Sequence, residues 1–273
     1  MKQKSSKKLL STSLLLVLIA LVSLTAATTA WMTIADSTRL KTMRLDVTSG
    51  ANLRFDLDSH ETFEEYVKSL RLIDIADRIL RDQGYHPREN PLSPVTTTDC
   101  IHFTLENGEP AAKESYMEFV LHFMATDDMV VHLTTAGEEG TRIFSDEVSD
   151  IAKAMRISFT ADDSTAVYDP GMEPGSEEGL GGKIFGLARG NRIVYDASNT
   201  LFFLNAGVDK PVTVRIWLEG TDEICTDALR GVPYHIQLRF VGTDENGNLL
   251  EDSRTTTRRS AAATPTEERN ENK

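Results

Sequence analysis

The chain has 273 residues with 42 acidic and 29 basic side chains, which gives a formal net charge of −13 at pH 7. So acidic a surface argues against a nucleic acid or an anionic membrane as the partner, and it suits an extracellular protein that could bind cations. The length is sufficient to bury the core of one large β-domain.

The N-terminus has the three parts of a secretory signal peptide. Four lysines occur in the first eight residues, an unbroken apolar run follows at 14–22, and small residues gather at 25–30. Cleavage after Ala30 would leave Trp31 as the new N-terminus. We therefore predict a signal peptide over 1–30 and a protein that signal peptidase releases from the membrane.

An uncleaved membrane anchor is the alternative for this segment. The apolar core is short for a bilayer span, which needs ~20 residues, and Ser and Thr dilute its flanks. However, no charged residue occurs from 9 to 35. The sequence favours cleavage and leaves the anchor open.

Alternation of apolar and polar residues begins soon after this segment and predicts two strands around the turn "SGAN" at 49–52. We expect a hairpin with one buried face, formed by residues 40–58. The inward side chains would be Met43, Leu45 and Val47 in the first strand and Leu53, Phe55 and Leu57 in the second.

A helical period interrupts the strands at 60–81, with Ser59 as the expected N-cap and Gly84 as the stop. We predict one amphipathic helix here, a helical insertion near 60–83 that lies against the strands. Its apolar residues are Phe63, Tyr66, Val67, Leu70 and Ile73.

Period-two alternation returns along the rest of the chain and predicts an antiparallel β-sandwich or jelly roll over 31–251. Short apolar runs at 192–196 and 201–205 add two more strands, and 145–154 contains a short helical turn. The alternating residues are Met117, Phe119, Leu121 and Phe123; Met129, Val131 and Leu133; Met155, Ile157 and Phe159; Val212, Val214, Ile216 and Leu218; and Ile236, Leu238 and Phe240. We expect Phe55, Leu57, Phe119, Leu121, Phe123, Ile157, Phe159, Ile216 and Leu238 inside.

Two segments have the composition of irregular chain. Residues 169–182, "DPGMEPGSEEGLGG", predict a flexible surface loop. Residues 252–273 have almost no apolar content and predict a disordered tail without a sorting motif.

Two stretches resemble catalytic motifs without completing them. In "GLGGKIFG" at 179–186, Ile184 stands where a dinucleotide fingerprint needs its third glycine, and Lys183 lacks the following Ser or Thr of a P-loop. "HETFE" begins like a zincin helix at His60, but Glu64 occupies the position of the second histidine. We predict a loop and a solvated helix start.

The candidate cation sites are equally incomplete. "DENGN" at 244–248 alternates oxygen ligands as a calcium loop does, but Gly247 comes two places early, so a hairpin turn is favoured. An acidic cluster could hold calcium, but a solvated loop is the favoured interpretation; its residues are Glu219, Asp222, Glu223 and Asp227. Four isolated histidines are predicted to be surface residues: His102, His122, His132 and His235. No catalytic, cofactor-binding or metal residue is predicted.

The two cysteines, Cys100 and Cys225, are far apart in the sequence. In an exported protein they could form one disulfide or remain two free thiols, and the sequence does not decide between these states.

Four stretches resemble one family of exported proteins from Gram-positive bacteria. "KKLL…TTAW" at 7–31 resembles the export signals cut by the SipW-type signal peptidase. The bearers of this signal include TasA and camelysin, secreted β-sandwich proteins of the cell surface and biofilm matrix. "LSPVTTTD", "YMEFVLHFMATDDMVVHL" and "VTVRIWLEGTDEICTDAL" resemble uncharacterised members. The chain departs from the pattern at Met32, where a second aromatic residue is common, and in its predicted helix.

The resemblance implies an exported, non-enzymatic structural protein of the cell surface or biofilm matrix, which assembles with itself through strand exchange or binds other matrix or cell-wall components. The first strand could pair within its own sheet or add to a neighbour. One alternative is a camelysin-like surface metallopeptidase. Another is a jelly-roll module for ligand binding or adhesion, for which Trp217, out of phase with its strand, is the aromatic residue to locate.

Overall fold

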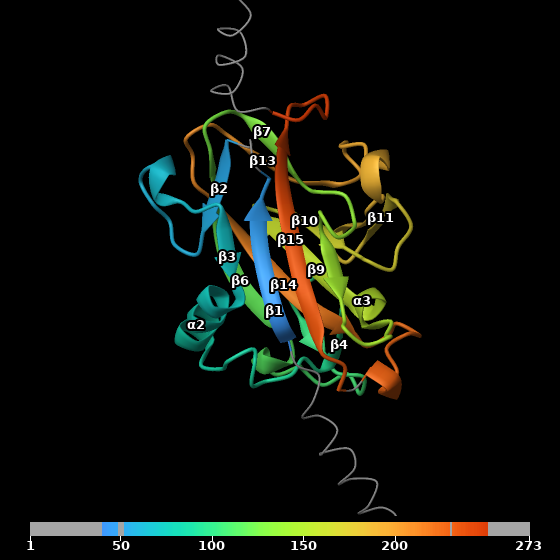
Figure 1. Ribbon diagram of the computed structural model, residues 1–273. Helices are drawn as coiled ribbons and strands as arrows, with labels where there is room; N and C mark the ends of the chain where they lie inside the picture. Colours follow the sequence, from blue (N-terminus) through green and yellow to red (C-terminus); the bar gives the residue numbers. More distant parts are fainter. Residues whose placement is uncertain (1–39, 49–51, 230, 251–273) are drawn as a thin grey trace, which may run out of the picture.

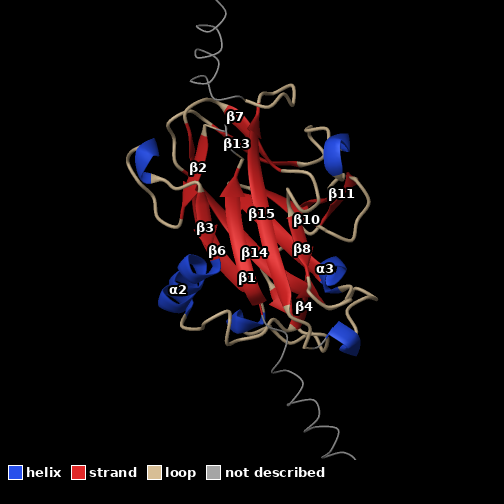
Figure 2. Cartoon of the chain, viewed as in Figure 1, coloured by secondary structure: helices blue, strands red, loops and turns tan. Residues whose placement is uncertain are grey.

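The computed structural model describes residues 40–48, 52–229 and 231–250. Over these ranges the protein is mainly β, with two sheets packed as a sandwich and short helices at its periphery (Figures 1 and 2). The predicted fold class is confirmed. The expected signal peptide, its cleavage point and the expected tail lie outside the described residues.

The front sheet in Figure 1, here called sheet A, contains the first and last described strands side by side. In spatial order its strands are β13 (Thr200–Leu204), β7 (Met129–Leu133), β15 (Tyr234–Thr243), β1 (Leu40–Val47) and β3 (Ser69–Arg71), with β8 (Arg142–Phe144) also paired to β15. β1 and β15 run parallel, with Leu45 opposite Leu238.

The second sheet, sheet B, is centred on the long strand β14 (Lys210–Glu219), which pairs with three others. Its spatial order is β11 (Gly175–Gly179), β12 (Gly182–Gly186), β10 (Ser164–Tyr168), β9 (Met155–Ala161), β14, β4 (Pro94–Thr97) and β5 (Phe103–Thr104), while β6 (Met117–Ala125) pairs with β14 and with β2 (Leu53–Asp56). Most pairings are antiparallel, but β1–β15, β10–β12 and β14–β4 are parallel, so the sheets are mixed.

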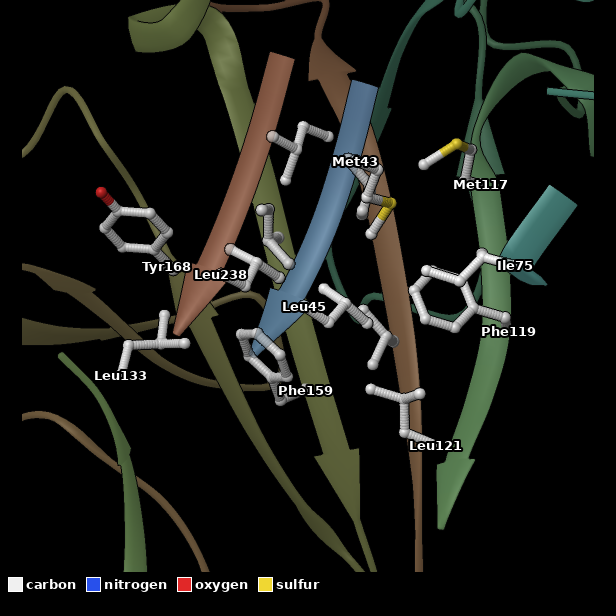
Figure 3. Packing of buried hydrophobic residues seen from close by; sticks show 14 of the residues in the cluster. Met43, Leu45, Ile75, Met117, Phe119, Leu121, Leu133, Phe159, Tyr168 and Leu238 are labelled. Carbon is white, nitrogen blue, oxygen red and sulfur yellow. The ribbon is translucent and has the colours of Figure 1, made fainter. Parts of the chain in front are cut away.

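The core lies between the sheets, where side chains of β1 and β15 meet those of β6, β9 and β14 (Figure 3). All nine predicted core residues are buried, each at most 7% exposed. Aromatic rings at the centre pack edge to face, with Phe123 5.2 Å and Phe159 5.9 Å from Phe240 between ring centroids. Alternation therefore identified the buried face of these strands correctly.

The predicted hairpin of residues 40–58 is wrong, although its burial pattern is right. β1 belongs to sheet A and β2 to sheet B, so the two strands do not pair with each other. Both strands direct their apolar residues to the same core from opposite sides. An alternating pattern specifies which face is buried and leaves the pairing partner open, which is why the hairpin seemed to fit.

The predicted helix starts too early. Residues 60–71 contain only a short 3₁₀ turn, η1 (Phe63–Glu65), and β3, because Val67 pairs with Phe55 and β3 pairs with β1. The helix α2 (Leu72–Gln83) follows and packs against β6, β3 and β1. Gly84 ends it with φ of 82°, as predicted, a left-handed conformation that suits glycine.

Of the other expected elements, two are confirmed and two differ from the prediction. The helical turn at 145–154 is confirmed as α3 (Ile151–Ala154), and the strand at 201–205 as β13. Residues 192–196 form no strand. The expected flexible loop at 169–182 contains β11, which forms a hairpin with β12. The remaining 3₁₀ helices are η2 (Lys113–Ser115), η3 (Gly190–Arg192) and η4 (Asp227–Leu229).

Candidate functional site

The first strand is the element most directly tied to the predicted assembly. β1 lies between β15 and β3, so both of its edges are paired within its own chain. Its buried side chains are Leu40, Met43, Leu45 and Val47, each at most 7% exposed. Burial of side chains of this size contributes ~1.5–3 kcal/mol apiece, and their sum approaches the ~5–15 kcal/mol stability of a domain. Withdrawing β1 would therefore unfold the protein.

A cluster of polar side chains around Asp209 joins the segment before β3 to sheet B. One carboxylate oxygen of Asp209 accepts hydrogen bonds from Ser59 Oγ at 2.9 Å and His122 Nδ1 at 2.8 Å. The other oxygen accepts one from the Tyr66 hydroxyl at 2.8 Å. Ser59 was predicted to cap a helix, and it binds this carboxylate instead. The cluster fixes the path of the chain toward β3.

The same geometry limits the chemistry of this cluster. Burial acts to raise the pKa of Asp209, but the hydrogen bonds from His122, Tyr66 and Ser59 outweigh it, so the pKa is lowered. A serine nucleophile needs a base beside its hydroxyl. Here the Ser59 hydroxyl and the His122 imidazole both donate to one carboxylate, which leaves the serine without an imidazole acceptor. The arrangement is that of a structural brace.

The segment that begins like a zincin helix is not part of a long helix. His60 precedes η1, and Glu64 lies within it. The His60 ring packs edge-on against Tyr66, with centroids 5.0 Å apart, and its Nε2 lies 3.5 Å from Asp56 Oδ2. The two groups of the motif therefore do not share the helical face that a zincin requires.

His132 was expected at the surface, but its side chain is buried. It is 1% exposed, its Nδ1 lies 2.7 Å from Asn199 Oδ1, and its Nε2 lies 3.2 Å from Thr243 Oγ1. The chain before β13 covers this outer face of sheet A, with the Tyr195 ring 5.2 Å from the imidazole. Burial lowers the pKa of His132, so the fold holds a neutral imidazole.

This burial predicts a loss of stability below about pH 6.5. The unfolded chain takes up the His132 proton near 6.5, whereas the folded protein, with its lowered pKa, resists it. The free energy of unfolding should then fall as the pH drops from 6.5 toward the folded pKa, by up to ~1.4 kcal/mol per pH unit. Denaturant titrations of wild type and His132→Gln at several pH values test this. Equal pH slopes in the two proteins would contradict it.

The other predicted isolated histidines also have partners. His102 Nδ1 lies 2.7 Å from Asp99, and this hydrogen bond is the main cause of the lowered pKa of that carboxyl. His235 bridges two elements, with Asp146 at 3.0 Å from Nε2 and Thr42 of β1 at 2.7 Å from Nδ1. Each of these two histidines thus contacts one aspartate, and the two pairs lie in different parts of the fold.

Both cysteines are free thiols, so the disulfide that the sequence left open is not formed in the structure. Cys100 is buried with Val95, Phe103 and Trp217 in a small cluster, while Cys225 packs against the main core. Burial raises the pKa of Cys100 to about 11 and also raises that of Cys225. Both thiols are therefore protonated near neutral pH and are poor nucleophiles.

The acidic cluster at 219–227 is not simply a solvated loop. Glu219 is 8% exposed and accepts hydrogen bonds from Trp217 Nε1 at 3.0 Å and Thr221 Oγ1 at 2.8 Å. Asp222 forms an ion pair with Arg156 at 2.8 Å. Trp217 is fully buried, so it does not form the exposed aromatic surface that a ligand-binding module would present. Glu219 and Asp222 therefore satisfy donors within the protein, whereas Glu223 and Asp227 are exposed, as the prediction of a solvated loop expected.

The turn at 244–248 is confirmed. Asp244 Oδ1 accepts the backbone N–H groups of Asn246 and Asn248, and Gly247 has φ of 80°. The Asn248 side-chain amide also donates to Asp244. This hydrogen bond is the main cause of the lowered pKa of Asp244, and the backbone hydrogen bonds add to it. The oxygens that resembled calcium ligands are used to close the turn.

The glycine-rich stretch at 179–186 forms a β-hairpin rather than a loop. Leu180 and Gly181 both have positive φ, 53° and 74°, as a two-residue type I′ turn requires. The turn borders an open groove of about 750 Å³, whose opposite wall is β13. Lys183 lines this groove and donates to the backbone oxygen of Ala197 at 2.6 Å, and burial lowers its pKa to about 8.

Within residues 40–48, 52–229 and 231–250, the structure contains no group of three or more His, Cys, Asp or Glu side chains placed to hold a metal ion. Over the same ranges, no helix has the length and apolar character of a membrane span. No protein-family model, curated protein or solved structure matches the chain. The resemblance to TasA and camelysin remains a prediction.

Proposed function

We propose that the protein is an exported structural component of the cell surface or extracellular matrix and that it assembles through its N-terminal segment. The observation that carries the proposal is the position of β1. It follows the signal-like sequence and is already a core strand of its own sheet. The proposal assigns the pairing with a partner to the nine residues between the expected cleavage point and β1, 31–39.

Two features support a non-enzymatic role. Ser59 and His122 both donate to Asp209, and this contact braces a loop. The two thiols are held in their protonated form. Trp217, which could have presented an exposed aromatic surface to a ligand, is buried. Signal peptidase would be the partner during export, and a second copy or another matrix or cell-wall component would be the partner afterwards.

Deletion of 31–39 from the secreted form should abolish polymerisation and leave the monomer folded, because β1 starts at Leu40. Electron microscopy and sedimentation of the wild-type and shortened proteins measure assembly, and circular dichroism confirms the fold. If the wild type remains monomeric at high concentration, or if the shortened chain polymerises equally well, the assembly role is wrong.

A further inference from the structure

The groove between β13 and the β11–β12 hairpin has the size and lining of a small-ligand site. Its volume of about 750 Å³ lies in the range of ~300–1,000 Å³ typical of such sites. Apolar side chains of β13 form one wall, and Phe203, which is 39% exposed, is the most accessible of them. The hydroxyl-bearing residues Ser164, Thr165 and Thr200 also line the space, together with charged side chains. A ligand in this groove would therefore meet an aromatic ring beside polar groups.

Within the described residues, Lys183 is a partly buried cation of this groove that has no carboxylate partner. Its ammonium group donates to the backbone oxygen of Ala197 at 2.6 Å. Glu178 lies opposite Lys183 in the β11–β12 pairing, yet the two side chains do not form an ion pair. Lys210, which also lines the groove, is paired with Asp162 at 2.7 Å. Since an ammonium group has three N–H donors, Lys183 keeps two for a ligand.

The charge of the groove allows an anion to approach. The whole chain has a formal net charge of −13, whereas the charged side chains that line the groove in the described residues, two basic and two acidic, sum to zero. Burial lowers the pKa of Lys183 to about 8, because the fold has removed part of the water around its ammonium group. A carboxylate that binds Lys183 would restore the lost stabilisation of this charge with little further desolvation of the lysine. The position of Lys183 therefore favours an anionic group in the groove.

We propose that the groove binds a sugar that carries a carboxylate, such as the uronic-acid units of an acidic polysaccharide. The sugar carboxylate accepts hydrogen bonds from Lys183, and the apolar C–H groups of the sugar ring pack on Phe203. The sugar hydroxyls donate to Asp162 and Glu178, and Asp162 is 78% exposed, so it keeps free acceptor positions beside Lys210. A simple inorganic anion would use Lys183 alone and would be repelled by these two carboxylates, which is why a hydroxylated ligand is favoured.

This inference goes beyond the proposed assembly, because the site belongs to one copy and does not involve the N-terminal segment. The residues that line it come from β9 to β14 and from the turns between those strands. For a protein of the cell surface or matrix, the ligand would be an acidic polysaccharide in its surroundings. The shortened protein without 31–39 should bind the sugar as the longer chain does, so failure of the assembly and failure of the sugar site can be told apart.

A matched pair of small sugars tests the carboxylate. Methyl β-glucuronide has a carboxylate where methyl β-glucoside has a hydroxymethyl group, and propionate supplies a carboxylate without the sugar. Backbone amide chemical shifts of the secreted protein, titrated at constant ionic strength, give each affinity and locate the bound ligand. We expect the glucuronide to bind at least about tenfold more tightly than either of the others, with shifts around Lys183 and Phe203. Equally tight binding of the glucoside or of propionate, shifts elsewhere, or no shifts with the glucuronide would overturn the site.

Two lysine variants show whether Lys183 supplies the cation. Lys183→Met should weaken binding of the glucuronide by about tenfold or more, because it removes the charged hydrogen-bond donor, and should leave the binding of the glucoside unchanged. Lys68→Met is the matched control, since it removes the same charge from an exposed position that does not line the groove. Thermal melts check that both variants are folded. Equal affinities of the two folded variants for the glucuronide contradict the site.

The pH dependence gives a measurement that keeps the lysine in place. In the wild type the affinity for the glucuronide should fall as the pH rises from about 7 to about 9, because Lys183 loses its proton in this range. The titratable groups near Lys183 are Glu178 on β11, Asp196 before β13 and His132 on β7. Asp196 and His132 have lowered pKa values, so neither changes its charge in this range. Lys183→Arg, which stays charged, should bind with no such fall. A wild-type affinity that is constant over this range, or the same fall in the arginine variant, would overturn the role of Lys183.

Discussion

Replacement of Leu121 by aspartate should abolish the folded state at room temperature. Leu121 is fully buried on β6, where it faces the strands of sheet A across the core (Figure 3). The substitution removes a packed side chain, at ~2–5 kcal/mol, and places a carboxylate where it has no partner, at several kcal/mol more. Together these terms are comparable to a total stability of ~5–15 kcal/mol.

The control for this variant is Val120→Asp. Val120 is the preceding residue, points to the other face of sheet B and is only partly buried. Its carboxylate can reach solvent, so a smaller loss of stability is expected. Far-ultraviolet circular dichroism and thermal melts compare the two. A Leu121→Asp protein that melts like wild type would show that the core assignment for β6 is incorrect.

Replacement of Arg156 by methionine should destabilise the protein by ~3–5 kcal/mol, the range for removing one partner of a buried ion pair. The guanidinium lies 3.0 Å from Asp169 and 2.8 Å from Asp222, and the three side chains are 12%, 14% and 17% exposed. Burial raises the pKa of Asp169, and Arg156 opposes that rise. Without Arg156, two carboxylates remain close together in a poorly solvated site.

The loss should shrink at low pH. Removal of Arg156 raises the folded-state pKa of Asp169 further above its unfolded value, so the penalty is present above that pKa and is relieved as the pH falls through it. Lys210→Met is the matched control, because its partner Asp162 is 78% exposed, and such surface pairs contribute ~0–1 kcal/mol. Denaturant titrations at neutral and acidic pH test the prediction, and equal losses in both variants would contradict it.

The sequence predicted the buried faces of the strands well because each strand records its own environment. Leu45 and Phe55 each lie between two charged residues in the sequence, and both are buried. The pairing of β1 with β15 could not be read in this way. Leu45 and Leu238 are opposite each other across 193 residues of chain, and nothing in either local pattern names the other.

The contacts of the polar side chains could not be predicted from the sequence for a related reason. Asp209 is an ordinary loop residue until the fold brings Ser59, Tyr66 and His122 to it. The alternation in β7 places His132 on the polar face of the strand. Its side chain is buried only because the chain before β13 covers that face. Turns were more predictable, because Gly84 and Gly247 act through their own backbone conformation.

The parallel pairing of β1 with β15 also sets the order in which the chain can mature. A polypeptide that enters a compartment N-terminus first delivers β1 early and β15 almost last. Until residue 234 arrives, β1 has only the three-residue strand β3 to pair with, and closing so long a loop is entropically slow. If the protein is exported as proposed, sheet A is therefore completed only when nearly all of the described chain has crossed the membrane.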